Sequence, residues 1–111
     1  MKYYVNLKDV KEGRKEPYKS FYLLDGNNGC VAGCRTGISI HSNTEWSTND
    51  IHHDTQEGFL VLEGTGWARV GDSEFRIEPE VSIIAPADKV HNFKRAPSSK
   101  PIKLFWFHAA I

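Results

Sequence analysis

The chain has 111 residues, 40% of them hydrophobic and 25% charged, which is enough for one domain with a core that needs no disulfide staple. Fourteen basic residues balance fourteen acidic ones, so no overall field attracts nucleic acid or an anionic membrane. No apolar run approaches the roughly 20 residues of a membrane span, and residues 1–9 lack the apolar core of a secretory signal. We therefore expect one cytoplasmic domain, residues 1–111, with neither nucleic acid nor membrane as a partner.

The pattern along the chain is a series of short strands separated by turn signals. Residues 2–7 alternate loosely like an edge strand, and the highly charged residues 8–19 indicate a surface loop. Strands are expected at 20–24, 30–42, 57–63, 67–70, 74–77, 81–84, 90–93 and 102–108, with an extended segment at 45–53. Because no window shows a sustained 3.6-residue period, the sequence predicts an all-β barrel or double-sheet roll.

The segment 50–66 carries the main candidate site. On an extended chain, His53 and Glu57 leave the same face, which Phe59 continues, while Leu60 and Leu62 form the opposite face. A strand that is apolar on both faces, with polar groups at its entrance, suits a wall between a barrel interior and a second layer.

A third candidate ligand is His91, which follows a proline-containing turn and shares a face with Phe93. Two histidines and one carboxylate suit a divalent transition metal such as Fe, Mn, Ni, Co or Zn, with open positions for a substrate. The alternative for His53, Glu57 and His91 is an interior polar cluster without metal. An unpaired buried carboxylate costs several kcal/mol, which favours the metal site.

Other side chains near this segment are candidates for additional ligands or for the wall of the cavity. Alternation directs His52 away from the interior, although a bulge would re-aim it. Arg69, if it points inward, is a natural partner for a carboxylate-bearing ligand. His41 is expected as a strand-end residue, and the pattern gives no preference for the side of His108. Phe59, Phe93, Trp67 and Trp106 are candidates for the cavity wall, or ordinary barrel core.

The two cysteines, Cys30 and Cys34, lack the second pair that a structural zinc site needs. If both lie on the strand expected at 30–42, they are roughly 13 Å apart, which is too far for a disulfide. We therefore expect two reduced, partly buried thiols.

Within residues 44–95 the sequence resembles the small single-domain cupins. The resemblance is carried by His53-Asp-Thr-Gln-Glu57, by Val61-Leu-Glu-Gly64 and by Pro86-Ala-Asp-Lys-Val-His91, and it places cupin motifs at 51–64 and 79–95. The string from Glu57 to Gly71 also looks like the sugar-sensing arms of AraC-type regulators. Ile51 stands where a cupin has its first histidine, and Asp88 stands where it has a turn glycine.

The resemblance implies a cupin-type double-stranded β-helix, or jelly-roll barrel, with metal ligands at His53, Glu57 and His91. It also implies a small polar ligand or substrate and an enzyme of the isomerase, oxygenase or decarboxylase type. The alternatives are a non-catalytic module that senses a small ligand and a metal-free cupin. Small cupins commonly pair through apolar outer surfaces, so Leu60, Leu62 and residues 20–24 indicate a homodimer.

Overall fold

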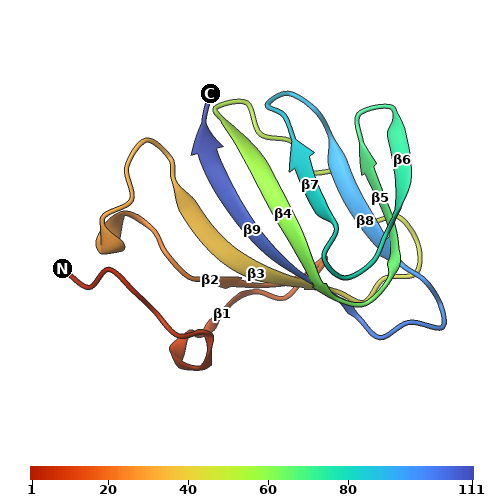
Figure 1. Cartoon of the computed structure of the whole chain (residues 1–111), viewed down its shortest axis with the longest axis horizontal. Coiled ribbons are helices and arrows are strands. Elements are labelled where there is room, and N and C mark those ends of the chain that lie inside the picture. The colour runs from red at the N-terminus through yellow and green to blue at the C-terminus, as the bar shows by residue number, and fades with distance from the viewer.

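The computed structural model describes residues 1–111 and contains nine strands and two single turns of 3-10 helix (Figure 1). The elements are η1 (Leu7–Asp9), β1 (Glu12–Arg14), β2 (Lys19–Tyr22), η2 (Gly26–Asn28), β3 (Arg35–His41), β4 (Thr55–Glu63), β5 (Gly66–Val70), β6 (Ser73–Ile77), β7 (Ser82–Ala85), β8 (His91–Arg95) and β9 (Ile102–Ala110). Neither helical turn has the length and apolar character that crossing a membrane requires.

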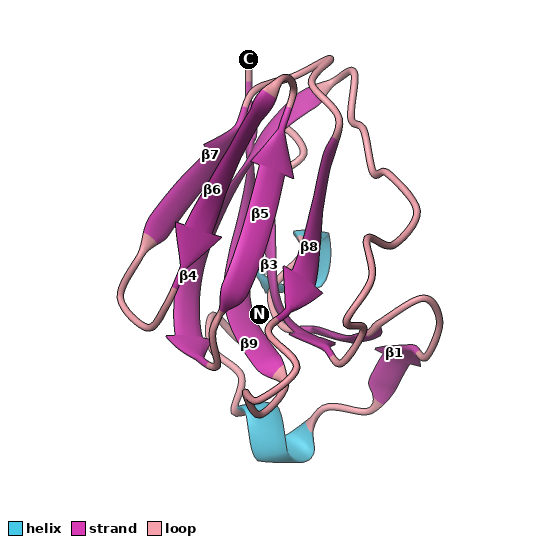
Figure 2. Cartoon of the chain, turned by 90° about the vertical axis from the view of Figure 1, so that its right-hand side faces the viewer, coloured by secondary structure: helices cyan, strands magenta, loops and turns pink.

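The strands form two antiparallel sheets. The larger sheet has the order β1-β2-β3-β9-β4-β7, and the smaller has the order β6-β5-β8. Figure 2 shows the smaller sheet in front of the larger one, so that the two sheets form the layers of a roll. Since β9 pairs with both β3 and β4, and β4 pairs with β7, the topology is that of a jelly roll rather than a simple meander. The predicted all-β double-sheet fold is confirmed.

The core lies between the two sheets and takes residues from both. Ten buried side chains form it: Phe59, Val61, Ala68, Ile77, Ile83, Ala85, Phe93, Ile102, Leu104 and Trp106. Ile77, Ile102 and Leu104 have no exposed surface, so truncation of any one of them to alanine would cost about 2–5 kcal/mol.

Strand β4 has the alternation that the sequence predicts. Phe59 and Val61 are buried at 4% and 1% exposure, whereas Leu60 and Leu62 keep 39% and 41% of their surface exposed on the outer face. Because the period of a strand is two, Glu57 lies on the same inward face as Phe59.

Several predicted segments differ from the structure. Residues 2–7 form no strand, and β1 lies inside the charged segment that was expected to be a loop. The strand expected at 30–42 begins only at Arg35, because Ala32 and Gly33 have positive φ angles of 54° and 78° and turn the chain. Residues 45–53 contain a single bridge, from Asp50 to His91, in place of a longer strand.

Candidate metal centre

Four separate parts of the chain bring polar groups to one point inside the roll. Glu57 on β4 lies directly opposite His108 on the neighbouring strand β9. His91 begins β8 in the facing sheet, and His52 lies in the loop just before β4. Glu57, His91 and His108 are all buried, with 3–7% exposure. Strand pairing and the loop together place three imidazoles around one carboxylate.

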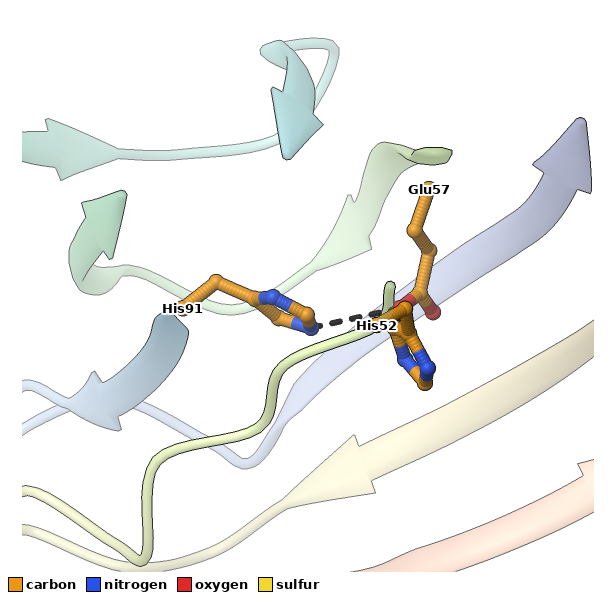
Figure 3. Close-up of side chains that lie close together, drawn as sticks. All are labelled: His52, Glu57 and His91. Carbon is orange, nitrogen blue, oxygen red and sulfur yellow. Dashed lines mark ion pairs between the residues drawn. The ribbon is translucent and has the colours of Figure 1, made fainter. Parts of the chain in front are cut away.

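The Nε2 atoms of all three histidines approach the carboxylate of Glu57. His52 and His91 lie 3.0 and 3.2 Å from Oε1, and His108 lies 3.4 Å from Oε2. Figure 3 shows His52 and His91 meeting Glu57 from different directions. The ligand atoms of His52, Glu57 and His91 all lie within 4.8 Å of one another.

The carboxylate of Glu57 is held in its charged form. Burial alone would raise its pKa, but hydrogen bonds from His108, His52 and His91 outweigh burial and hold the pKa of Glu57 well below its usual range. The hydrogen bond to Glu57 raises the pKa of His52, against the opposing effect of its partial burial. The cluster is therefore an ionised acceptor surrounded by imidazoles.

The donor set fits a divalent transition ion. Imidazole nitrogen and carboxylate oxygen are borderline donors of the kind that such ions take in proteins. Nδ1 of His108 lies 3.0 Å from the Thr55 hydroxyl, so this ring can present Nε2 to the centre. His52, Glu57 and His91 could hold an ion, and Nε2 of His108 lies beside the same carboxylate.

The predicted inward orientation of His53 is wrong. His53 keeps 74% of its side chain exposed, and its Nδ1 lies 2.6 Å from the exposed carboxylate of Asp88. The strand alternation does not reach this far, because the chain bends at residues 53 and 54 and β4 begins only at Thr55. The loop is fixed by the Asp50 bridge to His91 and by the Asp88 amide, which donates to the His52 carbonyl at 2.8 Å. His52 takes the inward place instead.

A cavity of about 110 Å³ opens onto this cluster. It is lined by Arg14, Tyr18, Ser20, Tyr22, Arg35, Ser39, His41, Asp50, His52, Glu57, Phe59, His91, Phe93, Trp106 and His108. Phe59, Phe93 and Trp106 thus line the cavity as well as filling the core. Arg69 does not reach it, because its guanidinium stacks 4.0 Å above the ring of Trp46.

Sequence reasoning missed most of the polar wall of this cavity. The hydroxyl of Tyr18 donates to Asp50 and accepts from Arg14, each at 2.8 Å. Burial, followed by the charge of Asp50, raises the pKa of Tyr18 above its usual range, so the phenol stays protonated. His41 is the buried end of β3, and burial lowers its pKa to about 3, which keeps this ring neutral. Only the pairing of β9 with β4 could have indicated His108, and that pairing is not local in sequence.

Comparison with known proteins identifies relatives of this fold. The family model described as Cupin domain matches residues 38–108. A comparison with curated proteins gave no match. Among solved structures, a predicted oxalate decarboxylase from Thermotoga maritima has 10% identity and a TM-score of 0.82, over 96% of this chain and 98% of that one.

Two further structures are similar. The Cnp3 cupin domain of Schizosaccharomyces pombe has 16% identity and a TM-score of 0.77, over 96% of this chain and 68% of that one. Hydroxypropylphosphonic acid epoxidase from S. wedmorenis, in complex with fosfomycin, has 15% identity and a TM-score of 0.79. That match covers 96% of this chain and 58% of the epoxidase. At these identities the likeness concerns the fold.

Proposed function

Because this chain belongs to the cupin family, we propose that it binds a divalent transition metal inside the roll and acts there on a small polar molecule. The predicted cupin-type jelly-roll barrel, which is the premise of this proposal, is confirmed by the family match and by the similar structures. The ligands in this proposal are His52, Glu57 and His91, with His108 as a fourth.

The observation that carries the proposal is the convergence of three Nε2 atoms on one buried carboxylate, at 3.0–3.4 Å. A charged carboxylate at this depth needs a compensating cation, and either a protonated imidazole or a metal ion can provide one. The cavity beside these residues is lined by polar groups and leaves room for a small substrate.

A bound ion would supply Lewis acidity, polarising an oxygen of the substrate. The side chains of the chain itself then bind and orient that substrate. Phe59, Phe93 and Trp106 form the apolar part of the wall, and Arg14 and Arg35 form a positive part. Arg35 is exposed at the start of β3 and makes no ion pair with any carboxylate of the chain.

The unpaired guanidinium of Arg35 favours a negatively charged substrate, since arginine binds carboxylates and phosphates in a two-pronged geometry. Two of the similar structures are consistent with this class, one being a predicted oxalate decarboxylase and the other an epoxidase of hydroxypropylphosphonic acid. We therefore propose a small organic acid as the substrate class, with isomerisation, oxygenation or decarboxylation as the type of reaction.

The second candidate is a module that binds the same class of ligand without turnover. The small volume of the cavity, about 110 Å³, is sufficient for recognition of a small molecule and does not by itself require chemistry. A thermal shift on addition of a small acid, without consumption of that acid, would favour this module over an enzyme.

The test of metal binding is elemental analysis of protein purified without chelators, paired with a substitution in the cluster. Glu57→Gln should lose the metal, because the neutral amide cannot replace the charged ligand. Glu63→Gln is the matched control, since Glu63 lies on the same strand but at the surface, paired with Lys100 at 3.0 Å. A wild-type protein without metal, unchanged in stability by chelator, would refute the metal proposal and leave a metal-free cupin.

A further inference from the structure

Outside the candidate metal centre, the two cysteines form a thiol pair. The Sγ atoms of Cys30 and Cys34 lie 3.3 Å apart, and both cysteines are free. Cys34 is exposed and Cys30 is half-buried. The expectation that these thiols lie on one strand and far apart is therefore wrong, because residues 30–34 form a turn before β3.

The backbone fixes this turn. The amide of Cys34 donates to the carbonyl of Val31 at 3.0 Å, and the amide of Cys30 donates to the carbonyl of Asp25 at 3.2 Å. Gly33 has a φ of +78°, and a Cβ at this position would meet Cγ2 of Thr55 at 3.0 Å. Glycine is therefore favoured at position 33, by the positive φ and by the tight contact with Thr55 on β4. The two sulfurs are held close in the folded protein.

Both thiols line a second cavity of about 380 Å³, beside the first. Its wall also contains Arg35, Asp54, Thr55 and His108. A small molecule can therefore reach the sulfurs from solvent, where the guanidinium of Arg35 and the carboxylates of Asp25 and Asp54 lie beside it. The hydrogen bond with Cys34 raises the pKa of Cys30, so what favours exchange at this pair is its exposure and the short distance between the sulfurs.

We propose that Cys30 and Cys34 are a modification site, at which a small-molecule disulfide such as glutathione disulfide reversibly oxidises the pair to an intramolecular disulfide. Since a disulfide has an S–S length of about 2.05 Å, the sulfurs need to approach by a little more than 1 Å, which rotation of the exposed Cys34 side chain can supply. Neither cysteine is a ligand in the proposed metal site, and the test of this proposal needs no metal.

The reaction balances through two exchanges. The thiolate of Cys34 attacks one sulfur of glutathione disulfide, forms a mixed disulfide and releases one glutathione thiolate, which takes up a proton. The thiolate of Cys30 then attacks the Cys34 sulfur and releases the second glutathione. Two protein thiols are oxidised to one disulfide, and one glutathione disulfide is reduced to two thiols. An excess of reduced glutathione drives the same steps backwards.

The test is a redox titration of the full chain. The protein is equilibrated with reduced and oxidised glutathione at fixed ratios, the free thiols are blocked with N-ethylmaleimide, and the intact mass is measured. As the oxidised fraction rises, the expected product is a monomeric chain that is two hydrogens lighter and carries no maleimide. Dithiothreitol should restore a chain that takes two maleimides.

Two single variants separate the steps. Cys30→Ser should stop at a glutathione adduct on Cys34, and Cys34→Ser should react more slowly, since Cys30 is the less exposed sulfur. If the wild-type protein yields only glutathione adducts, a disulfide between two chains, or two maleimides at every ratio, the proposal is overturned.

Discussion

The Thr55 hydroxyl and Nδ1 of His108 lie 3.0 Å apart, and this hydrogen bond leaves the Nε2 of His108 directed at Glu57. Both residues are buried, and their strands, β4 and β9, are neighbours in the large sheet. In the metal-free protein Nε2 donates to Glu57 and Nδ1 accepts from the hydroxyl, whereas with a metal bound Nδ1 would donate to the hydroxyl and Nε2 would offer its lone pair to the ion. Thr55 therefore acts on the site through His108, as a positioning residue.

Thr55→Val should weaken metal binding, because valine keeps the shape of threonine but cannot accept the hydrogen bond from His108. Loss of such a partner typically lowers metal affinity by about 10–100-fold. Affinity can be measured by competition with a chromogenic chelator, and Thr55→Ser, which keeps the hydroxyl, should restore most of it. Equal affinities for the valine and serine variants would show that the hydrogen bond has no part in the site.

The stability of the metal-free protein should fall as the pH drops below about 6.5, because of His41. Burial lowers the pKa of His41 to about 3 in the folded state, so between pH 3 and pH 6.5 the unfolded chain binds one more proton than the folded chain. The contribution of His41 to stability is therefore fully present above its unfolded pKa and is lost as the pH falls. Between pH 6.5 and pH 5 the loss should be about 1–2 kcal/mol.

Urea denaturation at a series of pH values measures this loss. Glu57, whose pKa is depressed, loses its contribution only at lower pH, and His52, whose pKa is raised, loses its contribution only as the pH rises above about 6.5. The window between pH 5 and pH 6.5 therefore reports mainly on His41. His41→Gln should flatten the slope in this window, and a variant with the wild-type slope would contradict the assignment.

Arg35→Ala should weaken the binding of small organic acids at the cavity. A charge-assisted hydrogen bond contributes about 1.5–3 kcal/mol, so the dissociation constant should rise by about tenfold or more. Calorimetry or thermal shift with a panel of small carboxylates and phosphonates would detect the change. Arg76→Ala is the control, since Arg76 stacks on Trp67 and does not line the cavity. If both variants bind the acids equally well, Arg35 has no part in ligand recognition.

A homodimer stays a prediction, and the large sheet has an exposed apolar patch that could form its surface. On the outer face of the large sheet, Leu60, Ile84 and Phe107 are 39%, 50% and 41% exposed. Ile84 and Phe107 both lie opposite Gly58, on either side of β4, so the apolar surface is continuous. Ile84→Lys should shift sedimentation at micromolar concentration towards the monomer, whereas Tyr3→Lys, at another exposed apolar residue, should not. A wild-type protein that sediments only as a monomer would refute the dimer.

Much of the fold was predictable because its information is local. The turn signals and the alternation of Phe59, Leu60 and Val61 correctly predicted β4 and its inward face. Glu57 and His91 were also placed correctly on the inner side, since both lie at or inside a strand.

The wrong predictions concern residues outside the strands, where side chains no longer alternate between the two faces of a sheet. His53 and His52 exchange roles because two bends precede β4, and no pattern of residue types marks the point at which alternation begins. Cys30 and Cys34 meet because residues 31–33 turn, although Ala32 with positive φ is not a turn signal in the sequence. Arg69 was only a candidate for the cavity, and its guanidinium stacks on Trp46, which is distant in sequence, on the outer side.

The proposal that His52, and not its neighbour His53, binds the metal is tested most directly by the metal content of two variants, His52→Ala and His53→Ala. Both should fold, because neither side chain belongs to the hydrophobic core. We expect His52→Ala to lose the metal of the wild-type protein, while His53→Ala, whose side chain is exposed and paired with Asp88, retains it in full. Retention by His52→Ala together with loss by His53→Ala would contradict the site described here.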